Sequence, residues 1–487
     1  MEEKAIRGVS WSFLGLGLNK VVGLSTSLIL ARLLLPSDFG LMAIGLVAIN
    51  FLFWFGGISF GAALVIHQEL DRRGQGTVFT LSVGAASAAA AIAVGLAPVA
   101  ARTLHQPRLT GVLDWLALAV LLGGIISFYD ALLLRELEFQ RRFWATTTAS
   151  MLGSVLSIVL AVAGAGIWSL VAGQLFAAAI SATALVAVAP ARIAPRWDPA
   201  VARKVARSSR GYITQGVTVF IRQNIDTVMV GRWFSAASIG FYSMAFRLGD
   251  LTYSTLADPV ARVTFPAFAR GRARNEDVRP SFLGVIRLVA LFAFPAGLLL
   301  SAASRPFTET IFGANWGPMV GPLTVVGIWA AVRPVEATIA WLLNALGRAG
   351  TVGWVALIVL GPLAVGLAVA VRSGKLELVA LVPLADTILS LGILTVLARR
   401  HAQVQPRDIW RAVRPVFLSG AGLWAITRVV AGALGGLPPL VALAGCVLAG
   451  LGAYVASLWV IERDLLPVSF RQITRVLRRR QAEPAAP

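Results

Sequence analysis

Charge is scarce in this chain of 487 residues, and so are the residues that build most catalytic and metal centres. Only 14% of the residues are charged, whereas soluble proteins carry about a quarter. The single cysteine, Cys446, excludes an intrachain disulfide. The three histidines, His67, His105 and His401, lie far apart, so we expect no shared metal site. These shortages argue against a soluble, disulfide-stabilised or histidine-based metal protein.

The common catalytic motifs are also absent. The sequence has no phosphate loop of the G-x-x-x-x-G-K-[ST] type, no H-E-x-x-H, no C-x-x-C and no nucleophile elbow. The segments between apolar stretches are short, and the longest predicted outside loop covers only about residues 303–318. We therefore expect no enzymatic activity, no cofactor and no metal. The basic segments contain few aromatic residues, so we expect no nucleic-acid partner either.

Apolar residues are abundant instead. They make up 57% of the chain, and the mean hydropathy is +0.78. Stretches of ~20 apolar residues recur along the whole length, and each can cross a bilayer as a helix. This pattern predicts an all-α polytopic membrane protein with about fourteen transmembrane helices, the first of them a retained span and not a signal peptide. The predicted spans are about 9–33, 40–64, 77–100, 111–134, 145–164, 167–189, 211–232, 238–262, 281–302, 319–344, 352–371, 377–398, 414–433 and 438–460.

The positions of the cations predict the orientation. If both termini are cytoplasmic, 30 lysines and arginines fall on the inside and 7 on the outside. This bias is what the positive-inside rule requires, so most of the net charge of +20 reports topology. Six cations remain within spans and are not explained by the rule: Lys20, Arg222, Arg247, Arg287, Arg333 and Arg428.

An internal repeat predicts the domain organisation. Residues 30–42 resemble residues 230–242, with Gly40 matching Gly240, at the same place in the predicted topology. Such parallel repeats are related by an axis along the membrane normal. We predict two six-helix lobes around a central cavity, with two extra C-terminal helices. The predicted ranges are 1–190 for the N-terminal lobe, 191–210 for a basic cytoplasmic loop between lobes, 211–400 for the C-terminal lobe, 401–462 for the extra helices and 463–487 for a basic cytoplasmic tail.

The charges inside the spans are the candidate functional residues. An ionised side chain at mid-bilayer costs at least ~2.5–3.5 kcal/mol, so it must be paired or reach water. Arg222 and Asp226 share a helical face, and Arg247 and Asp250 stand three residues apart. Arg333 and Glu336 are also three apart, with Pro334 between them removing a helical N–H. Lys20, Arg287 and Asp386 complete the set.

Two interpretations of these charges stay open. Each arginine can be neutralised by its own carboxylate in a structural ion pair. Alternatively, the cations from both lobes converge on the cavity and bind an anion, and the arginine fork suits phosphate oxygens in particular. The acids Asp226, Asp250, Glu336 and Asp386 are then candidates for ion pairing or proton coupling.

Four stretches resemble one family. They are RGVSWSFLGLGLNKVVGLSTSLILARLLLPSDFGLMAI at the start, LLLRELEFQRRFW at 132–144, GFYSMAFRLGDL at 240–251 and NALGRAG at 344–350. Together they resemble the bacterial flippases of O-antigen, exopolysaccharide and teichuronic acid in the multidrug/oligosaccharidyl-lipid/polysaccharide exporter superfamily. The resemblance covers about residues 1–410.

The resemblance implies translocation of an undecaprenyl-pyrophosphate-linked oligosaccharide from the cytoplasmic to the periplasmic leaflet by alternating access. It also implies the bacterial inner membrane and a periplasmic polymerase as a possible partner. Related flippases of peptidoglycan precursor place a cation in span one and an arginine in span eight, which Lys20 and Arg247 match here. Pyrophosphate contacts are thus expected at Arg247 and Lys20, with Arg222, Arg333 and Arg287 as further candidates.

Other functions stay open at this point. An ion-coupled drug or small-molecule antiporter of the same superfamily is the main alternative, but an exporter of organic cations should have a cavity dominated by acids. A membrane-embedded polymerase or ligase usually needs a larger periplasmic loop than this chain has. A scaffold without transport is the fourth possibility.

Overall fold

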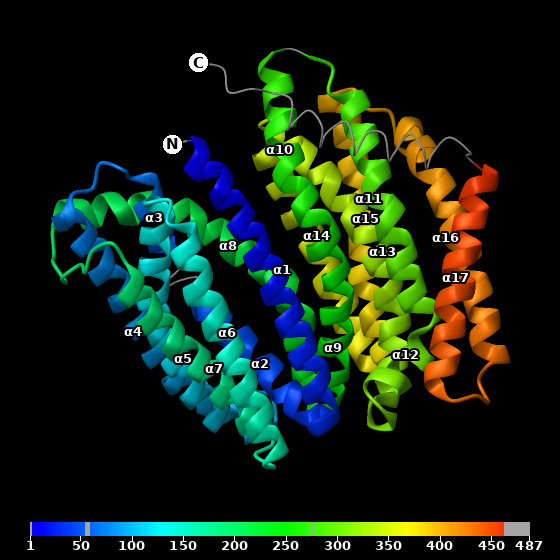
Figure 1. Cartoon of the computed structure of the whole chain (residues 1–487), viewed down its shortest axis with the longest axis horizontal. Helices are drawn as coiled ribbons and strands as arrows, with labels where there is room; N and C mark the ends of the chain where they lie inside the picture. Colours follow the sequence, from blue (N-terminus) through cyan, green and yellow to red (C-terminus); the bar gives the residue numbers. More distant parts are fainter. Residues whose placement is uncertain (1, 54–58, 275, 462–487) are drawn as a thin grey trace. The chain divides into compact units, whose positions relative to one another are not determined.

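The structure is a computed structural model that describes residues 2–53, 59–274 and 276–461. Within these ranges the regular structure is entirely helical (Figure 1). The α-helices are α1 (Glu2–Leu33), α2 (Pro36–Phe53), α3 (Ser59–Ile66), α4 (Arg72–Thr103), α5 (Leu109–Arg135), α6 (Phe139–Val162), α7 (Ile167–Val188), α8 (Pro199–Trp233), α9 (Ala236–Thr252), α10 (Asp258–Ala273), α11 (Arg279–Ala302), α12 (Ser304–Ile311), α13 (Val320–Ala345), α14 (Ala349–Ala370), α15 (Leu376–Ala402), α16 (Pro406–Ala433) and α17 (Pro439–Ile461). Three short helices join them: the π-helix η2 (Tyr253–Ala257) and the 3₁₀-helices η3 (Ala314–Met319) and η4 (Val371–Ser373).

Eleven helical segments in the described ranges are long and apolar enough to cross a membrane. Each overlaps a predicted span, so the prediction of an all-helical, multi-span membrane protein is confirmed. The helices that carry Lys20, Arg222 and Arg247 are not among the eleven. Helices α1 and α8 have more polar sequences than the eleven, and α9 has only 17 residues before the π-helix begins. The count of fourteen therefore stays a prediction.

The chain divides into two compact units, Met1–Ser243 and Met244–Pro487. The predicted lobe boundary at 191–210 stays a prediction, but the expectation of a loop throughout that segment is wrong. Helix α8 already begins at Pro199, because the Asp198 carboxylate accepts hydrogen bonds from the backbone N–H of Ala200 and Val201 at 2.8 and 3.3 Å. A proline in the first turn behind such a cap favours helix formation. The predicted tail at 463–487 lies outside the described residues.

The first unit has an apolar core among α3, α4 and α5. Leu64, Val78, Phe128 and Leu132 are completely or almost completely buried there. An ion pair joins α5 to α6. Arg142 donates two hydrogen bonds to the Asp130 carboxylate, at 2.6 and 3.1 Å.

Arg135, at the end of α5, makes a second polar contact at that end. It donates to the backbone carbonyls of Gln68 and Leu70 at 2.7 and 3.0 Å. The motif LLLRELEFQRRFW therefore holds helix ends together in this unit.

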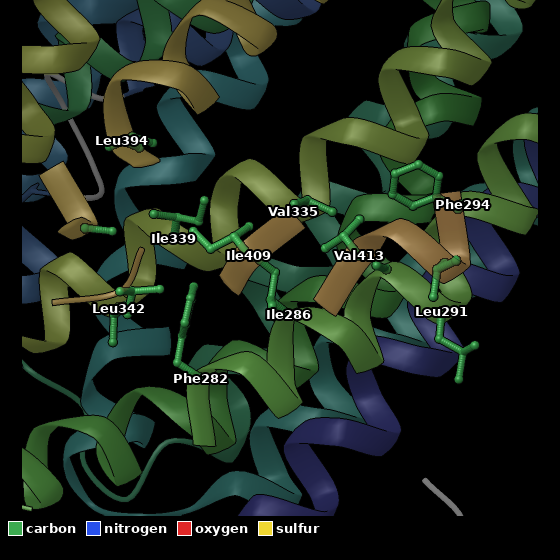
Figure 2. Close-up of a cluster of buried hydrophobic side chains, with 14 of the residues drawn as sticks. Phe282, Ile286, Leu291, Phe294, Val335, Ile339, Leu342, Leu394, Ile409 and Val413 are labelled. Atoms are coloured by element: carbon green, nitrogen blue, oxygen red, sulfur yellow. The ribbon is translucent and has the colours of Figure 1, made fainter. Parts of the chain in front are cut away.

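The second unit has its core among α11, α13, α15 and α16, shown in Figure 2. Phe282, Ile286, Ile339 and Leu342 are fully buried, and Ile409 of α16 packs beside them. The periodicity of these residues along α11 and α13 is that of one helical face. The core therefore fixes which faces of α13 and α15 turn inward, and these helices carry three of the candidate site residues.

Large apolar side chains also point outward. Val429 of α16 and Leu448 and Val460 of α17 each have more than 70% of their surface exposed. Helices that are apolar on both their packed and their exposed faces are typical of a protein surrounded by lipid. The exposed residues therefore agree with the membrane assignment.

Two predicted spans contain a local irregularity. The eighth is helical throughout, but its residues Tyr253–Ala257 form the π-helix η2 between α9 and α10. In the tenth span, Pro334 lies inside α13, which continues on both sides of it. A proline has no N–H to donate to the carbonyl four residues before it, here that of Ala330. One turn further along the helix, the Thr338 hydroxyl donates to the Pro334 carbonyl at 2.8 Å.

Candidate functional site

The candidate charges are distributed over both units. Lys20 lies on α1, and Arg222 and Asp226 lie on α8, in the first unit. The second unit holds the other six: Arg247 and Asp250 on α9, Arg287 on α11, Arg333 and Glu336 on α13, and Asp386 on α15. The predicted cavity shared by both units stays a prediction.

Arg333 is neutralised within its own helix. Its guanidinium forms an ion pair with Glu336 and lies over the ring of Tyr253, 5.1 Å from the ring centre. Glu336 is only 3% exposed, and its second carboxylate oxygen accepts a 2.6 Å hydrogen bond from the Ser390 hydroxyl of α15. A buried ion pair is tolerated when the remaining lone pairs are satisfied in this way. For this pair, the structural interpretation is the one that the geometry supports.

Two further carboxylates, those of Asp250 and Asp386, lie near enough to Arg333 for their charges to act on its guanidinium. Next to Asp386, the Thr387 hydroxyl accepts a 3.0 Å hydrogen bond from the Trp329 indole N–H, which joins α15 to α13. The environment of Arg333 is therefore rich in negative charge, and this arginine is poorly suited to an anionic ligand.

Arg247 has a different environment. Its side chain is exposed, and it forms no hydrogen bond, ion pair or ring contact with any residue in the described ranges. The pairing with Asp250 that the spacing suggested is not observed there. A guanidinium keeps its charge under almost all conditions. Among the described residues, Arg247 is thus the candidate cation whose donors are unoccupied.

In the first unit, Asp226 is held by neutral donors. The Tyr242 hydroxyl donates to its carboxylate at 2.7 Å, and the backbone N–H of Thr227 does so at 2.7 Å. Both Asp226 and Tyr242 are buried, at 8% and 0% exposed. The expected pair with Arg222 is not formed, because Asp226 turns toward Tyr242 on α9. Arg222 is half-buried and stays a candidate.

Lys20 lies next to a polar contact between helices. The side-chain amide of Asn19 donates to the Thr147 hydroxyl of α6 at 3.3 Å, and Lys20 itself is half-buried. Arg287 is likewise half-buried on α11. The structure therefore places both residues where the sequence located them, without assigning them a role.

Three contributing residues were missed by the sequence analysis: Tyr242, Tyr253 and Ser390. Tyr242 lies in the GFYSMAFRLGDL stretch, and Ser390 follows Asp386 by one helical turn. Tyrosine and serine are common on helix faces, so only contact with a carboxylate or guanidinium distinguishes them. In the part of the chain that the structure describes, no group of three or more histidine, cysteine, aspartate or glutamate residues could hold a metal ion.

Comparison with known proteins identifies the family. A model of the family described as "Polysaccharide biosynthesis protein" matches residues 29–321, which is more than half of the chain. The chain belongs to this family. This confirms the resemblance found in its sequence motifs.

Curated relatives of this chain are also proteins of polysaccharide biosynthesis. The succinoglycan biosynthesis transport protein ExoT of Rhizobium meliloti is 27% identical over 72% of this chain and 71% of its own length. The lipopolysaccharide biosynthesis protein WzxC of Escherichia coli is 25% identical over 72% and 71%. The teichuronic acid biosynthesis protein TuaB of Bacillus subtilis is 23% identical over 60% and 61%.

Solved structures show the same fold. The lipid II flippase MurJ, in an inward closed conformation, superposes with a TM-score of 0.74 at 14% identity, over 95% of this chain and 100% of its own. An inward-facing multidrug resistance MATE transporter reaches 0.65 at 13% identity, over 79% and 94%. The superpositions establish the architecture. At identities this low, they do not identify the ligand.

Proposed function

We propose that this protein translocates a lipid-linked oligosaccharide repeat unit across the bacterial inner membrane for surface polysaccharide synthesis. The cargo is an undecaprenyl-pyrophosphate-linked glycan that moves from the cytoplasmic to the periplasmic leaflet by alternating access. Membership of the polysaccharide biosynthesis family supports this function, and the names of the relatives place them in succinoglycan, lipopolysaccharide and teichuronic acid synthesis.

The observation that carries the proposal is the exposed and unpaired side chain of Arg247. A charge kept in an apolar span without a partner is costly unless a ligand or water compensates. A diphosphate offers oxygens that match the two-pronged guanidinium. We therefore assign Arg247 as the first pyrophosphate contact, with Lys20, Arg222 and Arg287 as further candidates. Arg333 has a structural role in this assignment, because Glu336 already neutralises it.

The alternative, a drug antiporter, receives less support. Export of organic cations needs carboxylates that are available to the ligand. Asp226 is occupied by Tyr242, and Glu336 by Arg333 and Ser390. We also propose transport in place of catalysis, both termini in the cytoplasm and a periplasmic polymerase acting on the product.

The test is polysaccharide export by variants in a strain deleted for its own copy of the protein. Because charge-assisted hydrogen bonds contribute ~1.5–3 kcal/mol, Arg247→Ala should lower export at least about tenfold at equal protein levels. Arg247→Lys should retain part of the function, since a point charge remains but the fork is lost. The matched control is Arg428→Ala. That arginine lies near the end of α16 and stacks on Trp424 at 5.6 Å.

The outcomes separate the two functions. Normal export by Arg247→Ala, with the protein present in the membrane, would refute the assignment of Arg247. Loss of export in the deletion strain without accumulation of lipid-linked repeat units would refute translocation of that cargo. Altered drug susceptibility with unchanged polysaccharide would favour the antiporter.

A further inference from the structure

A groove of about 490 Å³ lies between α4 and α5 in the first unit, and none of the candidate charges lines it. One carboxylate is its only ionisable lining residue, and all the others are apolar. The lining is Ala90, Ala91, Val94 and Gly95 from α4, and Asp114, Ala117, Leu118 and Leu121 from α5.

Small residues on α4 keep the groove open. A side-chain carbon added at Gly95 would meet nothing within 4 Å, so the space beside it is unfilled by protein. Val94 and Leu118 border this space and are 47% and 46% exposed. Both helices lie side by side in Figure 1, and both have the hydropathy of membrane spans. The groove is therefore apolar and opens toward the surroundings of the protein.

Asp114 lies at one end of this groove. It is half-buried and forms no hydrogen bond or ion pair with the residues that the structure describes. It lies five residues beyond Leu109, where α5 begins, which is roughly 7–8 Å along the helix. Leu118 and Leu121 lie one and two turns further in, about 6 and 10 Å beyond Asp114. A charge near the end of a span is thus followed by apolar surface toward the middle.

The position of Asp114 is not explained by helix capping. Acidic residues stabilise a helix when they occupy its first turn, and the effect falls off beyond that turn. Asp114 lies past the first turn of α5. A carboxylate beside apolar surface, without a partner among the described residues, is compensated by water or by a cation from outside the protein.

We propose that this groove binds a phospholipid with a primary amine headgroup, such as phosphatidylethanolamine. The ammonium group donates hydrogen bonds to the Asp114 carboxylate, and one acyl chain lies along Val94, Leu118 and Leu121. A choline headgroup has the same charge but no N–H donor, and a glycerol headgroup brings only the negative phosphate. The site selects its lipid by the donor and the charge together. None of the proposed pyrophosphate contacts lines it.

The test is native mass spectrometry of the purified protein, titrated with three lipids of identical chains: phosphatidylethanolamine, phosphatidylcholine and phosphatidylglycerol. The wild type should retain phosphatidylethanolamine most strongly. Asp114→Asn should lower that retention at least about tenfold, which equals ~1.4 kcal/mol, and should abolish the preference among headgroups. Glu309→Gln is the matched control, because Glu309 is an exposed carboxylate on α12 that does not line the groove.

A second pair of variants tests the chain-binding part without a change of charge. Gly95→Leu should fill the groove and lower retention of all three lipids. Gly84→Leu is its control, since Gly84 also lies on α4 with nothing within 4 Å but is not part of the lining. Equal retention of the ethanolamine and choline lipids by the wild type would overturn the proposal. Unchanged binding in Asp114→Asn, or an equal loss in Glu309→Gln, would also overturn it.

Discussion

Gly40 and Gly240 lie against each other so closely that neither position has room for a side chain. A Cβ atom at Gly40 would lie 1.8 Å from the carbonyl oxygen of Ala236, and one at Gly240 would lie 1.9 Å from that of Pro36. The contact is reciprocal, because each glycine faces the carbonyl four residues before the other. Two segments related by a two-fold axis make contacts of this kind. The sequence repeat that matches these two glycines therefore has a physical counterpart within the first unit.

Gly40→Ala should destabilise the protein strongly, as should Gly240→Ala. Alanine in a helix is normally more favourable than glycine by ~0.8–1.0 kcal/mol, so the sign of the effect reports the clash. We expect a lower melting temperature in detergent and less protein in the membrane. Gly84→Ala, where nothing lies within 4 Å, should be neutral or stabilising. A Gly40→Ala variant as stable as Gly84→Ala would contradict the close contact.

Tyr242→Phe should weaken the link between α8 and α9. It removes the 2.7 Å hydrogen bond to the buried Asp226 carboxylate and leaves the ring in place. Hydrogen bonds to charged groups contribute ~1.5–3 kcal/mol, so a clear drop in melting temperature is expected. Tyr129→Phe is the control, because Tyr129 is also buried, at 4% exposed, but its hydroxyl has no hydrogen-bond partner among the described residues. Equal effects of the two substitutions would count against the proposed bond.

Glu336→Gln should destabilise the protein by more than the loss of one ordinary hydrogen bond would. It removes the charge that compensates Arg333 in a site only 3% exposed at Glu336, and breaking such a buried pair costs ~3–5 kcal/mol. Replacing both partners, as in Arg333→Met with Glu336→Met, should recover part of the stability. Melting temperatures of the two variants measure the difference. If the double variant melts below the single one, the pair is not what destabilises Glu336→Gln.

The stability contributed by Glu69 should depend on pH. Glu69 accepts a 2.7 Å hydrogen bond from Lys204, and this contact, more than any other, lowers the pKa of Glu69 to about 2. The folded pKa is below the ordinary value of 4.5, so the contact stabilises the folded state above pH 4.5 and is lost as the pH falls toward 2. Because Glu69 is exposed, the effect is small and should shrink with added salt.

Melting curves of the wild type and of Glu69→Gln between pH 7 and pH 3 measure this contribution. The wild type should melt slightly higher at pH 7, and the two curves should converge as the pH falls. Exposed Glu309→Gln should show no such convergence. A constant difference across the whole range would contradict the assignment to Glu69.

The sequence predicted the helices well because each span follows from local composition. Each apolar stretch of bilayer length can be recognised by itself, and eleven of them overlap helices that are long and apolar enough to cross a membrane. The errors are also local. The sequence did not reveal that Asp198 caps a helix starting at Pro199, or that a π-helix interrupts the eighth span.

The pairing of the charges could not be predicted from their spacing. Arg333 and Glu336 form the ion pair that a separation of three residues allows. Arg247 and Asp250 have the same separation and do not pair in the described structure. Spacing along one helix decides which side chains share a face, but a partner from another helix can be the better one.

By itself the sequence determined the kind of protein, a multi-span helical membrane protein of a polysaccharide biosynthesis family, and the short set of ionisable residues inside its spans. These properties follow from composition, helix length and motif order, which are linear along the chain. Only the tertiary structure decided that Glu336 neutralises Arg333 and that Tyr242 holds Asp226. It also decided that Arg247 is left available. Those choices depend on which helix faces which, because a buried charge is satisfied by the donor or acceptor nearest in space and not in sequence.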